Sequence, residues 1–166
     1  VVANNDTAMA FGTYDVGAGA VFGGWLAQVD LFNSPVRYCG TNPNSTGEAG
    51  TIAVTGSADE IDNNLRLVAA NLPALEFGFF FYGSTQTLVP AGDGYLCVGG
   101  GLFRLVPAVK TDTSGFVSRA LDHNNLPNGG EIFVGSAWNF QFAYRDPAFG
   151  TAGFNFSDAL EVTFYD

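Results

Sequence analysis

Two carboxylates near the carboxyl end have the residue type and spacing that chemistry could use. Asp146 and Asp158 bound a short segment between two predicted strands, and a hairpin there would bring them together near its mouth. Two acids about 5 to 10 Å apart suit glycoside hydrolysis. With Asn155 they could instead hold Ca²⁺, which binds carboxylate and amide oxygens. The interpretation we favour is structural: Asp158 caps a turn through backbone amides, and Asp146 pairs with Arg145 or Arg104.

Other chemical motifs are weak. The one histidine, His123, lies in a turn-forming Leu-Asp-His-Asn-Asn segment, where an imidazole is expected to be solvated. No Gly-x-Ser-x-Gly elbow occurs, and Gly99–Gly101 precede no predicted helix, so they form no phosphate loop. The acidic cluster Asp59–Asn64 lacks EF-hand spacing and reads as a solvated loop, with Ca²⁺ as the alternative. We therefore expect no enzyme and no required cofactor, and Ca²⁺ is the one ion left open.

Aromatic side chains are the next candidates for a binding surface. Trp138 shares its register with Phe140 and Phe142, which predicts a place in the core. Trp25 follows two glycines and is equally compatible with the core and with a ligand or assembly surface. The other candidates for such a surface are Tyr82, Phe103, Phe149 and Tyr165. The excess of Phe (16) over Trp (2) favours contacts between proteins over sugar stacking, because Phe lacks a polar edge.

Composition limits the partners. Of 166 residues, 47% are hydrophobic and only 13% are charged, about half the usual share of roughly 25%. A polar but uncharged surface suits glycans or packed assemblies. The net charge of −10 disfavours nucleic acid and anionic lipid. No apolar run of 18 residues occurs, which predicts no membrane insertion.

The chain start and the cysteines suggest export. The sequence begins Val1-Val2 without an initiator Met, as expected for a processed mature chain or a module of a longer one. Cys39 and Cys97 fit no zinc or redox spacing. In an extracellular or cell-surface protein they would form a disulfide closing a loop of about 60 residues, worth roughly 4 kcal/mol. Two buried thiols are the alternative.

Period-two patterns dominate the chain and predict strands. The clearest are Trp138–Arg145 and Ala159–Tyr165, which alternate apolar and polar residues. Phe77–Tyr82 is apolar on both faces, so it should be a central strand covered on both sides, or one that meets a partner. The remaining predicted strands are Met9–Val16, Val21–Phe32, Thr51–Thr55, Leu65–Asn71, Tyr95–Gly99, Leu102–Val106 and Phe116–Leu121. Ala58–Ile61 is expected to form one helical turn.

About ten short strands predict an all-β fold. We expect a two-sheet antiparallel β-sandwich of jelly-roll type, with a closed barrel as the alternative. The length fits one domain over residues 1–166. Within it, residues 1–32 would be extra amino-terminal strands or an arm.

Several motifs carry a family resemblance. They are Tyr38-Cys39, Asn42–Gly47, Gly56-Ser57, Leu72-Pro73, Phe77–Phe80, Leu96–Gly100, Trp138–Gln141, Tyr144–Asp146 and Phe156–Ala159. In this order they resemble a β-rich domain common at the carboxyl ends of secreted proteins of planctomycetes and other marine bacteria. The resemblance spans about residues 38–164 and implies export, a β-rich fold and a Cys39–Cys97 bridge. It implies no catalytic residue.

Three functions are compatible with these features. The first is a structural surface protein, a filament or matrix subunit that self-associates by adding Met9–Val16 to the sheet of a neighbouring copy. The second is a carbohydrate-binding or adhesion module for an extracellular glycan. The third, a hydrolase or lyase, has the least support.

Overall fold

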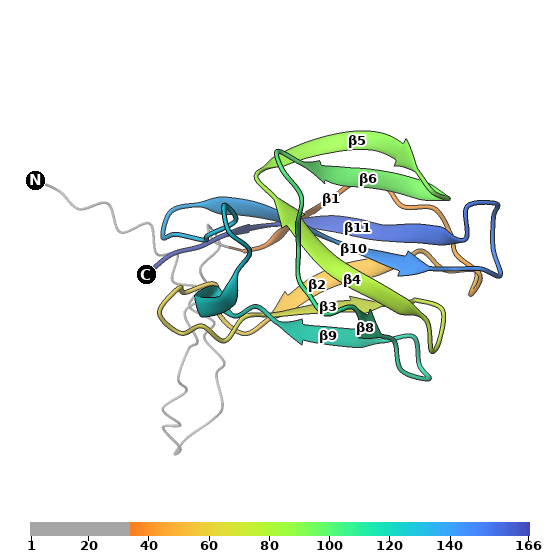
Figure 1. Cartoon of the computed structure of the whole chain (residues 1–166), viewed down its shortest axis with the longest axis horizontal. Coiled ribbons are helices and arrows are strands. Elements are labelled where there is room, and N and C mark those ends of the chain that lie inside the picture. Colours follow the sequence, from red (N-terminus) through yellow and green to blue (C-terminus); the bar gives the residue numbers. More distant parts are fainter. Residues whose placement is uncertain (1–33) are drawn as a thin grey trace, which may run out of the picture. The chain divides into compact units, whose positions relative to one another are not determined.

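Short alternating segments fold into eleven strands and one 3₁₀ helix over residues 34–166, the part of the chain that the computed structural model describes (Figure 1). The chain divides after Phe32 into two units, and the described residues belong to the second. The predicted strands Met9–Val16 and Val21–Phe32, and the candidate Trp25, lie outside the described residues.

In chain order the strands are β1 (Val36–Tyr38), β2 (Thr51–Thr55), β3 (Arg66–Ala70), β4 (Phe77–Gly83), β5 (Thr85–Ala91), β6 (Gly94–Gly99), β7 (Phe103–Arg104), β8 (Val109–Lys110), β9 (Val117–Ala120), β10 (Ala137–Arg145) and β11 (Phe154–Thr163). The 3₁₀ helix η1 (His123–Asn125) lies between β9 and β10.

These strands form three antiparallel sheets. The central sheet has the order β1-β11-β10-β4-β7, and β8 pairs with β4 beyond the end of β7. A three-stranded sheet, β2-β3-β9, lies on one side of it, and the hairpin β5–β6 lies on the other (Figure 1). The predicted all-β sandwich is therefore present, it is not closed into a barrel, and the hairpin adds a third layer.

The main core lies between the central sheet and the three-stranded sheet. Alternation along β4 and β10 points Phe80 and Phe142 into it, with their ring centroids 4.5 Å apart. They meet Ile52 and Leu67 of the three-stranded sheet, which are also fully buried. Gly78 is required at its place in β4, because a Cβ there would lie 2.4 Å from the Phe142 ring.

The opposite residues of the same strands form a second, smaller core beneath the hairpin. Phe81 and Ala143 of the central sheet meet Cys97 and Val98 of β6 there. The prediction that Phe77–Tyr82 is covered on both faces is therefore confirmed for most of the strand. No helix among residues 34–166 is long and apolar enough to cross a membrane.

Every strand predicted within residues 34–166 is present, but three were missed. β1 and β8 have only three and two residues, too few to show a period. β5 contains Pro90 and is exposed along most of its length, so it resembles a loop. The predicted helical turn at Ala58–Ile61 is wrong, since these residues form a bridge and a non-helical turn beside Tyr165.

Candidate functional site

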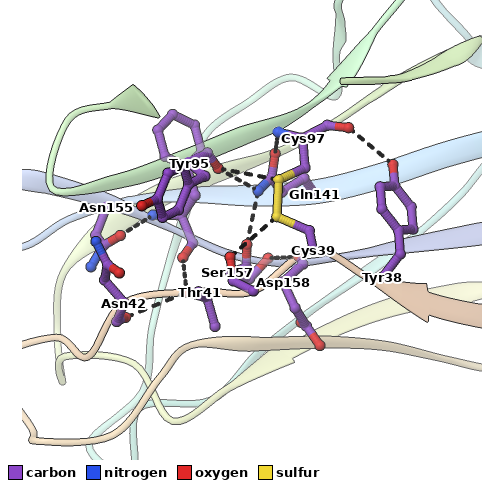
Figure 2. The surroundings of a disulfide bond; sticks show 12 residues. Tyr38, Cys39, Thr41, Asn42, Tyr95, Cys97, Gln141, Asn155, Ser157 and Asp158 are labelled. Atoms are coloured by element: carbon purple, nitrogen blue, oxygen red, sulfur yellow. Dashed lines mark hydrogen bonds between the residues drawn. A yellow bond between two sulfur atoms is a disulfide. The ribbon is translucent and has the colours of Figure 1, made fainter. Parts of the chain in front are cut away.

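A disulfide fixes the hairpin β5–β6 over the central sheet (Figure 2). Cys39, directly after β1, bonds to Cys97 of β6, with the two Cα atoms 6.2 Å apart. The neighbouring Tyr38 hydroxyl donates to the Cys97 carbonyl over 3.2 Å. Burial raises the pKa of Tyr38, so this phenol keeps its proton. The predicted Cys39–Cys97 bridge is present, and it joins the edge strand of the central sheet to the hairpin above it.

A buried amide on β10 completes this attachment. The Gln141 Nε2 donates to the carbonyls of Tyr95 (2.9 Å) and Ser157 (2.8 Å), and its Oε1 accepts from the Cys97 amide (3.0 Å). Figure 2 shows the side chain lying between β6 and β11. One side chain thus pairs the backbone groups that β6 turns toward the sheet, which would otherwise be buried without partners.

A β-bulge in β11 aims two polar residues of the Phe156–Ala159 motif. Gln141 pairs with Ala159 but Ala143 pairs with Phe156, so β11 carries one extra residue. The Ser157 hydroxyl accepts from the Phe142 amide, left unpaired by the bulge (3.0 Å).

Asp158, the other residue of the bulge, turns toward β2. Its Oδ1 accepts from the Ile52 amide (2.6 Å), and its Oδ2 lies 3.8 Å from Arg37. Burial raises the pKa of Asp158, and the Ile52 amide and Arg37 partly oppose that rise.

Asp146 and Asn155 anchor the loop that follows β1. Asp146 accepts from the Ser45 amide (2.9 Å), and Asn155 donates to the Pro43 carbonyl (3.2 Å). Within the loop, the buried Asn44 donates to the Asn71 carbonyl (2.7 Å). The Asn-Pro-Asn-Ser-Thr-Gly motif is therefore held through its backbone by Asp146 and Asn155, and its Asn44 side chain holds the backbone at Asn71.

The structure does not bring Asp146 and Asp158 together. β11 begins at Phe154, so Asp158 lies inside the strand, about four positions or roughly 13 Å from Asp146. The predicted place at a hairpin mouth is wrong because the bulge breaks the period that marks the start of the strand. Asp158 accepts from the Ile52 amide instead of capping its own turn. Asp146 accepts from the Ser45 amide, and among residues 34–166 it forms no ion pair with Arg145 or Arg104, so that predicted pairing is wrong. Within residues 34–166, no group of three or more His, Cys, Asp or Glu side chains could hold a metal ion.

His123 is half-buried and not solvated as predicted. Its Nδ1 lies 3.2 Å from the Glu60 carbonyl, and its ring packs edge-on against Phe164 at 5.4 Å. Asn63 accepts from the His123 amide and donates to Asp122. The predicted acidic loop is therefore tied to η1 by structural contacts.

The aromatic candidates for an exposed surface differ in their outcome. Tyr82 is fully buried, and its hydroxyl donates to the Gly130 carbonyl (2.5 Å), so its predicted exposure is wrong. The same burial raises the pKa of Tyr82 to about 12. Trp138 packs edge-on against Tyr82 at 5.2 Å, in the core as predicted. Phe149 is exposed and Tyr165 is half-buried.

A groove of about 500 Å³ opens on the hairpin side of the central sheet, and we call it the phenylalanine groove. Five phenylalanines from two strands line it: Phe77, Phe79, Phe81, Phe154 and Phe156. Leu96 of the hairpin and Leu102 before β7 contribute further apolar wall. The volume lies in the range of ligand pockets, roughly 300–1,000 Å³. Filling such a groove with an apolar group is favourable, because it removes apolar surface of both partners from water.

Three of the six basic side chains of the chain surround this groove. The Arg104 guanidinium lies 4.3 Å from the Phe79 ring centroid, and the Lys110 ammonium lies 5.6 Å from that of Phe77. Arg145 lines the wall. Among the described residues the one ion pair joins Arg37 to Asp158, so none of these three cations is paired with a carboxylate there.

The described lining of the phenylalanine groove is apolar and cationic. Among residues 34–166, its lining contains no carboxylate, imidazole or thiol, and the phenol of Tyr144 receives a hydrogen bond from Asn44 on the core side. The sequence signal for this site was the apolar character of both faces of Phe77–Tyr82. The two arginines had no such signal, because only the register places Arg104 opposite Phe81 and Arg145 next to the Tyr144–Gly78 pair.

Comparisons with protein-family models, curated proteins and solved structures find no match to this chain. The resemblance to the carboxyl-terminal domain of secreted planctomycete proteins therefore stays a prediction.

Proposed function

We propose that this chain is a non-enzymatic structural protein of an extracellular surface or matrix, and that it assembles by holding an apolar protein segment in the phenylalanine groove. The observation that carries the proposal is the groove itself. Its five Phe rings and three cations, which have no carboxylate partner among residues 34–166, form an apolar and positively charged binding surface. The disulfide supports an oxidising compartment, because such bonds persist mainly outside the cytosol.

A protein segment fits this groove better than a glycan does. Protein interfaces use Phe and Arg at their centres, whereas sugar sites stack on rings that also offer a polar edge. The part of its lining that the structure describes has no Trp, Asn or Asp, and its one phenol is already hydrogen-bonded. Glycan binding by a carbohydrate-binding module is therefore the alternative function, and the experiment below distinguishes it from assembly.

The test compares two leucines of similar exposure in the full chain. Leu102 is 50% exposed and lines the groove, while Leu88 of β5 is 65% exposed and does not. We expect Leu102→Asp to lose assembly and Leu88→Asp to keep it, measured by mass photometry and negative-stain electron microscopy. Thermal unfolding would establish that both variants are folded.

Two results would overturn the proposal. One is an intact chain that stays monomeric at high concentration. The other is a folded Leu102→Asp variant that assembles as well as the wild type. Retention of the wild type on insoluble polysaccharide, lost in Leu102→Asp, would favour the glycan function instead.

A further inference from the structure

The phenylalanine groove is complementary to a partner with two properties. Its apolar lining favours a partner with large apolar side chains, and its cations favour a partner with a negative charge. That charge belongs at one end, because Lys110 pairs with Phe77 in the β4–β8 register and Arg145 follows the Tyr144–Gly78 pair. Both therefore flank Phe77, whereas Arg104 lies four residues along β4, opposite Phe81.

The sequence of the chain itself contains a segment with these properties. Residues 1–33 carry three aspartates, Asp6, Asp15 and Asp30, and no Lys or Arg. All six basic residues belong to the remainder, so the charges of the two parts are complementary at the groove. Within Met9–Val16, Met9, Phe11 and Asp15 would share one face of an extended chain.

From these observations we infer that Met9–Val16 of a second copy occupies the phenylalanine groove, with Asp15 against Arg145 and Lys110 and with Phe11 over the Phe rings. This inference rests on the proposed function and names its partner. Asp15 and Phe11 are four residues apart, or about 13 Å when extended. The same spacing separates Phe77 from Phe81, so Asp15 can lie at the Phe77 end of the groove while Phe11 lies near Phe81. Residues 17–33 could reach about 55 Å, enough to join neighbouring copies.

A complementation experiment with full-length chains tests this directly. The donor variant carries Leu102→Asp, which places a charge in its groove so that the groove no longer binds the segment. The acceptor variant carries Phe11→Ser with Asp15→Lys, so that its own segment no longer binds. We expect each variant alone to be monomeric and their mixture to form one-to-one dimers in mass photometry. Head-to-tail contacts of this type build rings or filaments in the wild type and stop at two copies in the mixture.

Charge reversal provides a second, independent readout. Asp15→Lys should weaken association about tenfold, and adding Arg145→Glu with Lys110→Glu should restore most of that loss. Phe11→Ser should weaken it by roughly thirtyfold or more through lost apolar burial. Asp30→Lys is the matched control, because it changes the same charge elsewhere in the amino-terminal segment, and it should have little effect.

The outcomes separate this inference from the proposed function. If Leu102→Asp abolishes assembly while the Phe11 and Asp15 variants assemble normally, the groove has another occupant and the inference fails alone. If Asp30→Lys is the damaging change, a different segment binds and the inference is again wrong. A mixture that stays monomeric, although both variants are defective, also overturns it. Normal assembly of Leu102→Asp overturns both proposals.

Discussion

The two faces of the central sheet use the same residue type for opposite purposes. On the core face, Phe80, Phe140 and Phe142 are fully buried against the three-stranded sheet. On the other face, Phe77 is 51% exposed and Phe154 is 41% exposed, although they belong to the same or neighbouring strands. The difference arises from what covers each face: a complete apolar sheet on one side, and a short hairpin on the other. The exposure of a phenylalanine in this sheet therefore depends on which layer covers its face and not on the residue type.

The means of attachment differ in the same way. The three-stranded sheet is held mainly by apolar contact, with Ile52 and Leu67 in the main core. The hairpin is held by a smaller apolar core, by the disulfide and by the hydrogen bonds of Gln141. Such discrete ties fix a small element without closing the rest of the face, and the uncovered part is the phenylalanine groove.

The largest expected effect distinguishes the two faces by a matched pair of substitutions. Phe142→Ala should lower the free energy of unfolding by roughly 3–5 kcal/mol, because it opens a cavity in the core. Phe154→Ala should cost no more than about 1 kcal/mol, because its ring is already partly in water. Guanidinium unfolding of both variants would measure this. Equal losses would contradict the distinction between a sealed face and an open one.

Removal of the disulfide should have the next largest effect. Cys39→Ala with Cys97→Ala should lower the free energy of unfolding by about 2–4 kcal/mol, as expected for a bridge across 58 residues. Amide exchange should accelerate more in β5 and β6 than in β2 and β3, because the bridge holds the hairpin. Uniform acceleration across all sheets would show that the hairpin is not a separately tethered element.

The buried amide should contribute somewhat less. Gln141→Leu keeps the side-chain size but leaves the Cys97 amide and the Tyr95 carbonyl without their partner. An unsatisfied buried group costs roughly 1–3 kcal/mol, so chemical unfolding should show a loss of that order. A neutral or stabilising result would mean that β6 can pair its backbone in another way.

The smallest effect depends on pH and concerns Asp158. Burial raises the pKa of this carboxyl in the folded chain, so the folded state keeps the proton over a range where the unfolded chain has lost it. That stabilising contribution is complete below the unfolded pKa, near about 4, and disappears as pH rises through the folded pKa. Asp158→Asn keeps an acceptor for the Ile52 amide and removes this dependence. Its stability relative to the wild type should therefore rise as pH increases from about 4 through the folded pKa, and a constant difference would contradict the assignment.

Strand positions were largely predictable because burial on one or both faces leaves a period in the sequence. Trp138–Arg145 was predicted within one residue, and the predicted cover on both faces of Phe77–Tyr82 holds except at the exposed Phe77 and the half-buried Phe79. β5 was missed because it is mostly exposed and therefore lacks a periodic apolar pattern. It also contains Pro90, which an edge strand tolerates.

The candidate site was less predictable because it depends on register. Asp146 and Asp158 would be close if β11 started at Ala159, but β11 starts at Phe154 and passes through the bulge at Ser157 and Asp158. Arg104 is distant in sequence from Arg145, and no local pattern indicates that both reach one groove. The positions of strands follow from local burial, whereas the groove follows from how the strands pair.

The central claim is that a second copy fills the phenylalanine groove with its amino-terminal segment. The most direct measurement places a photoreactive benzoylphenylalanine at Leu102 in the full chain and mixes it with isotopically heavy chain before irradiation. Mass spectrometry should then find Leu102 joined to heavy peptides that contain Met9–Val16. Crosslinks only within one copy, or to any other segment of the heavy chain, would contradict the account.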